Sequence, residues 1–294
     1  MTPVPVSATT RLVGVTGWPL GHTLSPAIHN AAYEAMGLDW IYVPLPVERR
    51  TDLTALAEAM RVLPFVGLNV TMPHKESFAD LCDEVTSLAE AVGAVNAVQV
   101  VDGRLIGHNT DGQGLIDSLA DEGTVSLDGR TVVLIGAGGA AASALAAIAL
   151  EGAASVTVVN RSVGNAERLI DRLAPALGRT HAMAVRLGAA AREWVEAADV
   201  VINATPVGMG PSDGSPVPPQ WLHEGQIVAD MIYSPAVTPL LAQAREAGAI
   251  SVGGLGMLVA QGAASIEIWT GRPGSAPRDV MRRAAQDAVA AEHG

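Results

Sequence analysis

Residues 131–141 read Thr-Val-Val-Leu-Ile-Gly-Ala-Gly-Gly-Ala-Ala. The first five residues are an apolar run that predicts a fully buried strand. The glycines that follow permit a tight turn, and the alanine-rich stretch up to about Leu150 predicts a helix. A second apolar run, Ser155 to Val159, follows at the interval expected for the next strand. This order of strand, glycine-rich turn, helix and strand predicts an α/β fold with a parallel sheet.

The glycine-rich turn is typical of a dinucleotide-binding site, with alanine in the third small position. Glycines allow the backbone to approach a pyrophosphate closely, and the following helix N-terminus faces that negative charge. We therefore expect this turn to bind the cofactor through Gly136, Ala137, Gly138, Gly139 and Ala140.

The end of the second strand carries the cofactor preference. An NAD site usually has Asp or Glu there, which accepts from the ribose 2′-hydroxyl. This chain has Asn160, Arg161 and Ser162 instead, so no carboxylate repels a 2′-phosphate and a guanidinium is available to bind it. These residues predict NADP. The alternative for Arg161 is an ordinary exposed arginine.

The rest of the chain also alternates strands and helices, which favours α/β units throughout. A strand opens after Gly93 to Asn96, and Asp102-Gly103 predicts a hairpin turn back to Leu105. The other expected strands are 11–17, 40–47, 65–71, 199–205, 227–233 and 250–252. The other expected helices are 25–36, 53–60, 76–91, 113–121, 240–247, 257–269 and 277–290.

Composition excludes several classes of protein. The chain has 294 residues, long enough for one large or two ordinary domains. Hydrophobic residues make up 49% of it, which suits a globular protein with a full core. A net charge of −12 without a basic stripe argues against a nucleic-acid partner. The longest apolar run, Ala140 to Leu150, is too short to span a bilayer, so we expect no membrane segment.

Cysteine and histidine usage gives further limits. Cys82 is the only cysteine, which rules out an internal disulfide, and it falls on the apolar face of the helix expected over 76–91. The histidines show no metal-ligand spacing, so we predict no metal. The N-terminal residues lack the pattern of a secretory signal, and we expect a cytoplasmic protein.

A lysine follows the strand expected over 65–71, in the stretch Asn69-Val-Thr-Met-Pro-His-Lys75. A lysine near the positive end of a helix, if partly desolvated, is suited to exchange a proton. Taken alone, the stretch favours a surface lysine at a strand–helix turn, because most lysines are exposed.

Two other polar stretches lie where α/β proteins keep their sites. Ser25 followed by Pro26 predicts an N-cap, and with Thr23 it could bind an anion at a helix N-terminus. Asn109, Thr110 and Asp111 follow an expected strand and precede a glycine and a helix. Taken alone, Ser25 and Thr23 are more often a plain cap and a turn residue, and Asn109 and Asp111 could equally be plain loop and cap residues.

Together these stretches resemble the shikimate dehydrogenase family over nearly the whole chain. The matching motifs, in order, are Gly17…Pro19…His22-Thr-Leu-Ser-Pro26…His29-Asn30, Asn69-Val-Thr-Met-Pro-His-Lys75, Gly93-Ala-Val-Asn96, Asn109-Thr-Asp111, Gly136-Ala-Gly-Gly139, Asn160-Arg-Ser162, Asn203-Ala-Thr-Pro-Val-Gly-Met209, Asp230-Met-Ile-Tyr233 and Gly254-Leu-Gly-Met-Leu-Val-Ala-Gln261.

The resemblance implies NADPH-dependent reduction of 3-dehydroshikimate to shikimate, in the route to aromatic amino acids. It implies that Lys75 and Asp111 are the catalytic pair and that Thr23 and Ser25 bind the substrate carboxylate. The ring hydroxyls would be held by Asn69, Thr71, Asn96, Asp111, Tyr233 and Gln261. Further cofactor contacts would come from Thr205, Met231, Gly254 and Met257.

Two positions depart from the family pattern. Thr23 stands where many members have serine, which narrows the pocket and could change the preference among shikimate, quinate and amino analogues. Asn165 stands where a second basic residue is expected at the 2′-phosphate, which leaves Arg161 as its main partner. The alternatives are therefore an NAD-dependent quinate or aminoshikimate dehydrogenase, a catalytically silent NADP-binding regulator, and a general dinucleotide-binding module.

The order of the motifs predicts a two-domain α/β enzyme. Residues 1–112 with 255–294 would form the substrate domain, and residues 113–254 a Rossmann-type cofactor domain. The catalytic site is expected in a cleft between them. We expect small-molecule ligands only, and a monomer or homodimer.

Overall fold

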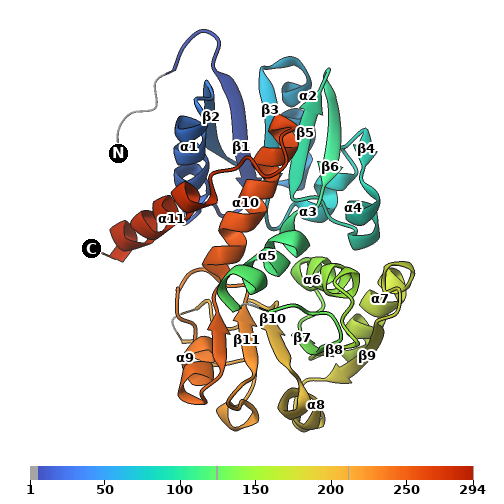
Figure 1. Ribbon diagram of the computed structural model, residues 1–294. Coiled ribbons are helices and arrows are strands. Elements are labelled where there is room, and N and C mark those ends of the chain that lie inside the picture. The colour runs from blue at the N-terminus through green and yellow to red at the C-terminus, as the bar shows by residue number, and fades with distance from the viewer. Residues whose placement is uncertain (1–5, 124, 211, 294) are drawn as a thin grey trace. The chain divides into compact units, whose positions relative to one another are not determined.

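The computed structural model describes residues 6–123, 125–210 and 212–293, and these form two compact units (Figure 1). The first unit comprises Met1–Thr110 with Gln261–Gly294, and the second comprises Asp111–Ala260. Each unit is built on its own sheet, so the fold is of the expected α/β class. Within the described ranges, no helix combines the length and the apolar character needed to cross a membrane.

The first unit contains a six-stranded mixed sheet in the order β2-β1-β3-β5-β6-β4. Strand β3 is parallel to β1 and antiparallel to β5, and β5 is antiparallel to β6. Positive φ angles of 50° at Asp102 and 74° at Gly103 form the tight turn between β5 and β6, which confirms the predicted hairpin. The strands are β1 Arg11–Gly17, β2 Trp40–Pro46, β3 Phe65–Val70, β4 Glu84–Val85, β5 Ala97–Val101 and β6 Arg104–His108.

Helices pack on both faces of this sheet because β3 is apolar or small on both sides. Leu68 and Val70 belong to the core beneath α2 (Leu53–Val62). On the opposite face, Gly67 leaves room for the indole of Trp269 from α10 (Gly254–Thr270). Helices α1 (Ser25–Met36) and α11 (Arg278–His293) lie side by side in this unit (Figure 1).

The single helix predicted over 76–91 is wrong. The chain instead forms α3 (Lys75–Ala79), then β4, then α4 (Ser87–Val92). Asp83 explains the interruption, because its carboxylate accepts a hydrogen bond from the backbone N–H of Leu105 at 2.7 Å and thereby joins the segment to β6. A hydrogen bond to a strand some twenty residues away competes successfully with continuation of the helix.

The prediction that Cys82 lies on a helical face fails for the same reason. Cys82 follows α3 in a turn, half-buried against the core of the first unit. Its Sγ donates to the carbonyl of Phe78 at 3.4 Å. Burial and the neighbouring Asp83 carboxylate raise the pKa of the thiol to about 12, so the side chain is a neutral packing group.

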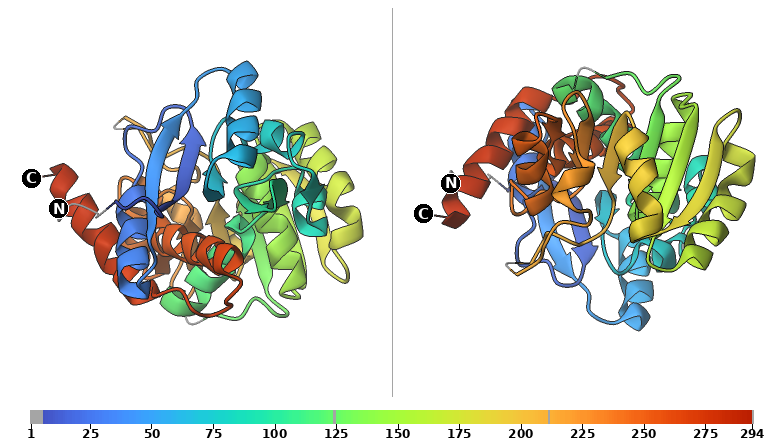
Figure 2. Two further views of the ribbon diagram at one scale, coloured as in Figure 1. Left: turned by 90° about the horizontal axis from the view of Figure 1, so that it is seen from above. Right: turned by 90° about the horizontal axis from the view of Figure 1, so that it is seen from below.

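The second unit contains a six-stranded parallel sheet in the order β12-β11-β10-β7-β8-β9. Figure 2, in the view from below, shows these strands side by side in one twisted sheet. The strands are β7 Thr131–Ile135, β8 Ser155–Asn160, β9 His181–Arg186, β10 Val200–Asn203, β11 Ile227–Asp230 and β12 Ile250–Val252. The chain runs outward from β7 through β8 to β9 and then returns to β10 on the other side, so the strand order reverses between β7 and β10. Ligands of such sheets bind at the carboxyl ends of the strands beside this reversal.

Helices of this unit include α5 (Asp111–Gly123), α6 (Gly139–Leu150), α7 (Val163–Leu173), α8 (Arg192–Ala197) and α9 (Pro239–Glu246). The predicted helix after the glycine-rich turn is confirmed as α6. Strand β9 and helices α7 and α8 were not expected from the sequence. The helix expected from Met257 begins earlier, at Gly254.

Helices α5 and α6 approach each other closely at Gly112. A Cβ atom at this position would lie 2.5 Å from the carbonyl oxygen of Ser143 and 2.8 Å from the Cβ of Ala147. One of these neighbours is backbone, so it cannot rotate away. The alanine-rich sequence of α6 thus provides the small side chains that such close packing requires.

We expect Gly112→Ala to lower the free energy of unfolding by about 1–3 kcal/mol, since overpacking displaces the α6 backbone. Gly164→Ala is a matched helical control, because its Cβ would meet only the flexible ends of the Arg168 and Glu167 side chains, at 3.5 and 3.9 Å. The control should be neutral or stabilising by up to about 1 kcal/mol. Urea unfolding of both variants measures the difference, and equal stability of the two would contradict the close packing.

Candidate active site

Polar side chains gather at one edge of the sheet in the first unit. Strand β5 runs opposite to β3 and β6, so β5 begins where β3 and β6 end. Asn69 lies near the end of β3, Asn96 directly precedes β5, and Thr110 follows β6. All three are buried, with relative exposures of 6%, 2% and 4%. Buried polar groups of this kind need hydrogen-bond partners.

Asn69 joins three elements through its side-chain amide. Its Oδ1 accepts from the hydroxyl of Tyr42 in β2 at 2.8 Å. Its Nδ2 donates to the carbonyl of Asn96 at 3.1 Å and to the hydroxyl of Ser265 in α10 at 3.0 Å. The amide is thus held in one orientation.

Asn96 extends the same network. Its Oδ1 accepts from the backbone N–H of Thr110 at 2.7 Å, and its Nδ2 donates to the Thr110 hydroxyl at 2.9 Å and to Oε1 of Gln261 at 3.4 Å. The Thr110 hydroxyl donates to the carbonyl of Gln261 at 3.1 Å. The structure therefore brings together the predicted substrate residues Asn69, Asn96 and Gln261.

The start of α1 differs from the prediction, because Ser25 is not an N-cap. The cap position is Leu24, with helical φ and ψ of −84° and −10° and no side-chain capping bond, and Ser25 is the first helical residue. The Ser25 hydroxyl forms a hydrogen bond with that of Tyr42, which opposes the rise in the pKa of Tyr42 caused by burial. The Ser25 backbone N–H donates to the Thr23 hydroxyl at 3.4 Å. Thr23 and Ser25 are therefore adjacent, and Ser25 belongs to the network.

A buried histidine anchors the turn that carries Thr71 and Lys75. The Nε2 of His74 donates to the carbonyl of Val47 at 2.6 Å, and its backbone N–H donates to the carbonyl of Thr71 at 3.0 Å. The carbonyl of Lys75 accepts from the backbone N–H of Val95 at 3.0 Å. Lys75 is half-buried as the first residue of α3, and it is the only lysine of the chain.

Asp111 and Tyr233 lie in the second unit, whereas Lys75 lies in the first. Asp111 is the first residue of α5, is 7% exposed, and follows Thr110 directly in the chain. Tyr233 follows β11 and is half-buried. The pairing of Lys75 with Asp111, and the approach of Tyr233 to the substrate, therefore stay predictions.

The glycine-rich turn of the second unit has the form that a dinucleotide needs. Gly136 has a φ of 120°, and a Cβ there would lie 3.0 Å from the carbonyl oxygen of Ala204. Gly138 is the N-cap of α6, and a Cβ at Gly138 or Gly139 would meet nothing within 4 Å. One side of the turn is thus packed against the sheet, and the other is open at a helix N-terminus. Backbone N–H groups in that position suit a pyrophosphate.

The other predicted cofactor residues lie at the carboxyl ends of the same strands. A Cβ at Gly254 would lie 2.7 Å from the carbonyl carbon of Met231, and Met257 is buried one turn further along α10. The methyl group of Thr205 would lie 3.1 Å from a Cβ at Gly136. Asn160 donates to the carbonyl of Ser162 at 3.0 Å, while Arg161 and Ser162 are exposed.

Asp230 holds two of these loops in place. Its carboxylate accepts from Nδ2 of Asn203 at 3.1 Å, from the hydroxyl of Thr238 at 2.7 Å and from the backbone N–H of Ile232 at 3.1 Å. Burial raises the pKa of Asp230 to about 6, although these donors favour the charged form. The loops after β10 and β11 are thereby fixed to each other.

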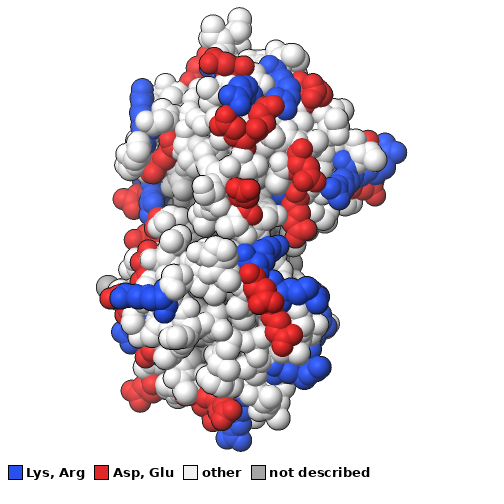
Figure 3. All heavy atoms as spheres, turned by 90° about the vertical axis from the view of Figure 1, so that its right-hand side faces the viewer, with Lys and Arg blue, Asp and Glu red and all other residues white. Residues whose placement is uncertain are grey.

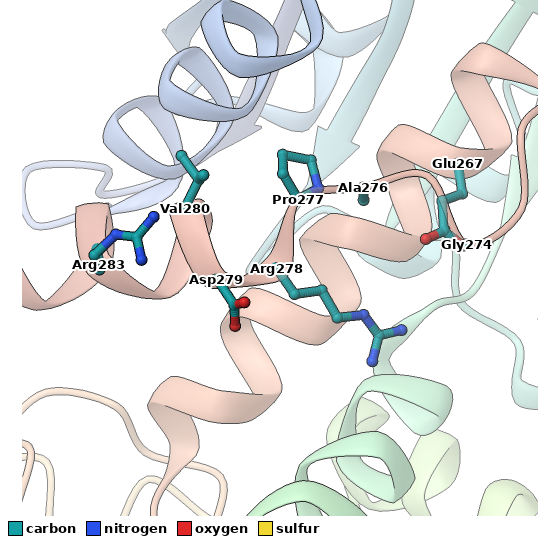
Figure 4. A pocket seen from close by; sticks show the side chains of 8 residues that line it. All are labelled: Glu267, Gly274, Ala276, Pro277, Arg278, Asp279, Val280 and Arg283. Carbon is teal, nitrogen blue, oxygen red and sulfur yellow. The ribbon is translucent and has the colours of Figure 1, made fainter.

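One hollow of the described surface lies away from these residues. It measures about 560 Å³ and is formed by the end of α10 and the start of α11 (Figure 4). Arg278 and Arg283 extend from different ends of this hollow and do not point toward each other (Figure 4). None of the predicted site residues lines it. No group of three or more His, Cys, Asp or Glu side chains in the described ranges is placed to hold a metal ion.

Comparisons with known proteins agree with this geometry. Residues 15–98 match the shikimate dehydrogenase substrate binding domain, residues 118–208 match shikimate / quinate 5-dehydrogenase, and residues 254–286 match the shikimate 5′-dehydrogenase C-terminal domain. The shikimate dehydrogenase (NADP(+)) of Geobacter metallireducens is 42% identical over 279 residues, which is 95% of this chain and 96% of that relative. The chain belongs to the shikimate dehydrogenase family.

Solved structures of the family show the same architecture. A crystal structure of a shikimate dehydrogenase in complex with NADP+ has a TM-score of 0.88 and 34% identity, and covers 97% of this chain and 98% of its own. The quinate dehydrogenase of Corynebacterium glutamicum in complex with NAD has a TM-score of 0.87 and 31% identity, and covers 95% and 99% of the two chains. These two neighbours thus differ in name and in bound cofactor, a shikimate dehydrogenase with NADP+ and a quinate dehydrogenase with NAD.

Reasoning from the sequence missed Tyr42 and Ser265 of the network, and it quoted Thr110 and His29 within motifs without assigning either of them a role. Tyr42 had a weak signal, because an aromatic residue in a strand is normally core. Its backbone N–H and carbonyl are both bonded by the side chain of Asn30, which belongs to one of the quoted motifs. Ser265 sits in an apolar helix without any local signal.

His29 contacts two residues of the network, Tyr42 and Ser25. Its ring stacks on Tyr42 with centroids 4.1 Å apart and an interplanar angle of 17°. Its Nδ1 donates to the carbonyl of Ser25 at 2.9 Å, and its Nε2 is buried and has no hydrogen-bond partner among the described residues. Burial lowers the pKa of His29 to about 4, although the Ser25 carbonyl opposes this shift. The ring is therefore neutral at physiological pH.

We expect this histidine to make the protein sensitive to acid. Between the ordinary pKa of 6.5 and about 4, the unfolded chain binds a proton that the folded chain does not. Stability should therefore fall as the pH decreases through this range, by up to about 3 kcal/mol from His29. His29→Phe should lose this part of the pH dependence in urea unfolding from pH 7 to 4. Tyr33→Phe, in the same ring cluster, should keep it. An unchanged slope in His29→Phe would contradict the assignment.

Proposed function

We propose that this protein is an NADP-dependent shikimate dehydrogenase that reversibly reduces 3-dehydroshikimate to shikimate, in the route to aromatic amino acids. The observation that carries the proposal is the hydrogen-bonded network of Asn69, Asn96 and Gln261. These residues come from distant parts of the chain, and each was expected to hold a ring hydroxyl. The family and the cofactor of its relatives support the same activity.

Recognition of the substrate follows from the donors of the first unit. The hydroxyls of Thr23 and Ser25 would bind the carboxylate, since a hydroxyl rotates to donate to whichever acceptor is present. Amide groups both donate and accept, as ring hydroxyls do, so Asn69, Asn96 and Gln261 match them chemically. We propose that Thr71, Asp111 and Tyr233 complete this set.

Reduction of a ketone requires a hydride at carbon and a proton at oxygen. NADPH supplies the hydride when bound. Lys75, as an ammonium, would stabilise the negative charge that develops on the oxygen and donate the proton. Asp111 would accept a hydrogen bond from the lysine or the hydroxyl and orient both. In the oxidative direction the neutral amine of Lys75 would take the proton back.

The composition of the chain supports an amine at this position. The chain has 18 Lys and Arg residues, and all except Lys75 are arginine. An arginine would supply charge but retains its proton, because its pKa is above 12. A chain that uses arginine everywhere else but lysine at the start of α3 is consistent with a need for proton transfer there.

We expect Lys75→Met and Lys75→Arg to lower kcat about 10³-fold while changing the KM for shikimate and the affinity for NADP+ only about threefold or less. Glu76→Gln, the exposed neighbour on the same short helix, should retain turnover. Steady-state oxidation of shikimate measures all three. Full activity of Lys75→Arg would exclude proton donation by Lys75.

Substrate and cofactor preference can be tested in one matrix of shikimate or quinate with NADP+ or NAD+. We expect shikimate with NADP+ to give the highest kcat/KM. Thr23→Ser should raise relative turnover of quinate or amino analogues less than about tenfold, because one methyl group changes pocket affinity only modestly. Higher kcat/KM with NAD+ or quinate would favour the alternative enzyme, which Thr23 and Asn165 keep open.

A catalytically silent NADP-binding regulator is a second class of function. It is disfavoured because such a protein has no need of Lys75 and Asp111, and absence of turnover with every pair would support it. We also propose a cytoplasmic location and a monomeric or homodimeric state. The half-buried free thiol of Cys82 is compatible with a reducing compartment.

A further inference from the structure

A group of three arginines surrounds the turn after β8, which was expected to bind the 2′-phosphate of NADP. Arg161 belongs to the turn itself. Arg186 closes the neighbouring strand β9, pairs in register with Asn160, and donates from Nη1 to the carbonyl of Arg161 at 3.4 Å. Arg168 on α7 donates from Nη2 to Oδ1 of Asn165. The Arg186 guanidinium therefore reaches the turn from β9, and the Arg168 guanidinium lies at the first turn of α7, which follows it directly.

Arg168 supplies a positive charge close to Asn165, where a second basic residue was expected. The sequence suggested that Asn165 leaves the 2′-phosphate with Arg161 as its main cationic partner. In the structure, the Arg168 guanidinium folds back along α7, and its Nη1 lies 3.5 Å from where a Cβ of Gly164 would be. The first turn of α7 therefore carries the positive charge of Arg168, next to Asn165, where a basic residue was expected.

The charge of the three arginines is not neutralised within the described residues. The chain contains 30 Asp and Glu residues, and arginines elsewhere form ion pairs with them, for example Arg61 with Asp83 and Arg104 with Glu84. Arg161, Arg168 and Arg186 form no such ion pair within residues 6–123, 125–210 and 212–293. Figure 3 looks onto the side where α7 and β9 lie in Figure 1, and basic and acidic side chains are mixed there. These guanidinium groups are therefore available to an anionic ligand, and their position beside the turn after β8 distinguishes them from other arginines without an ion pair in the described ranges, such as Arg172.

We propose that Arg168 and Arg186 bind the 2′-phosphate together with Arg161 and determine the preference for NADP over NAD. A planar guanidinium donates two parallel hydrogen bonds to phosphate oxygens, which suits all three side chains. The hydrogen bonds to Asn165 and to the Arg161 carbonyl position Arg168 and Arg186 before the ligand arrives, which reduces the entropic cost of binding. This inference rests on the proposed use of NADP.

Direct binding of two nucleotide fragments tests the inference without any ring substrate. Isothermal titration would compare adenosine 2′,5′-bisphosphate with adenosine 5′-monophosphate. Arg168→Gln and Arg186→Gln should each weaken binding of the bisphosphate about tenfold or more, and leave the monophosphate within about twofold, since the charged hydrogen bonds of one guanidinium to the 2′-phosphate are lost. Arg172→Gln, four residues further along α7 and equally exposed, should bind both fragments as the wild type does.

Kinetics with the complete cofactors provide a second readout. The KM for NADP+ should rise about tenfold in Arg168→Gln and Arg186→Gln while the KM for NAD+ stays unchanged. Arg186→Lys should raise the KM for NADP+ less than Arg186→Gln does, because lysine keeps the positive charge although it lacks the planar guanidinium. Circular dichroism of each variant checks that the fold is retained.

The outcomes separate this inference from the proposed function. Wild-type affinity for the bisphosphate in both glutamine variants, or equal weakening for both fragments, would overturn the role of Arg168 and Arg186. Weakened bisphosphate binding in a protein that does not oxidise shikimate would support the arginine site and count against the dehydrogenase activity alone.

Discussion

The side-chain amide of Asn69 is the interaction on which the first unit depends. Its oxygen accepts from Tyr42 in β2, and its nitrogen donates to Asn96, the residue before β5, and to Ser265 in α10. A buried amide whose partners are removed costs about 1–3 kcal/mol for each unsatisfied group, so each partner constrains the others. The edge of the sheet is thereby fixed in one arrangement before a substrate binds, which is what recognition of several ring hydroxyls requires.

The same constraint operates at the edge of the sheet in the second unit. Asp230 uses its carboxylate to fix the loops that carry Thr205 and Met231, at the side of the sheet where the strand order reverses. In both units a buried polar group at the end of a strand holds the flanking loops. The open side of Gly138 and Gly139 then remains for the ligand rather than for packing.

Arginine and lysine occupy different places in this chain. Arginine supplies the charge on the surface and around the turn after β8, where a permanent cation with a planar fork is suitable. Lysine occurs only at the start of α3, where we propose a group that exchanges its proton. The placement of the single lysine therefore says more about the proposed mechanism than the net charge does. The net charge of −12 argues only against a nucleic-acid partner.

The sequence by itself determined the α/β class, the glycine-rich turn, the hairpin at Asp102-Gly103 and the types of residue that carry the chemistry. These features depend on local backbone preferences and on the period of apolar residues, which a linear pattern contains. The tertiary structure decided where hydrogen bonds go when a distant partner competes with a local one. Asp83 interrupted the helix expected over 76–91, Ser25 joined Tyr42 instead of capping α1, and Arg186 came to donate to the carbonyl of Arg161. Those partners lie far apart in the chain, so only the folded protein brings them within hydrogen-bond distance.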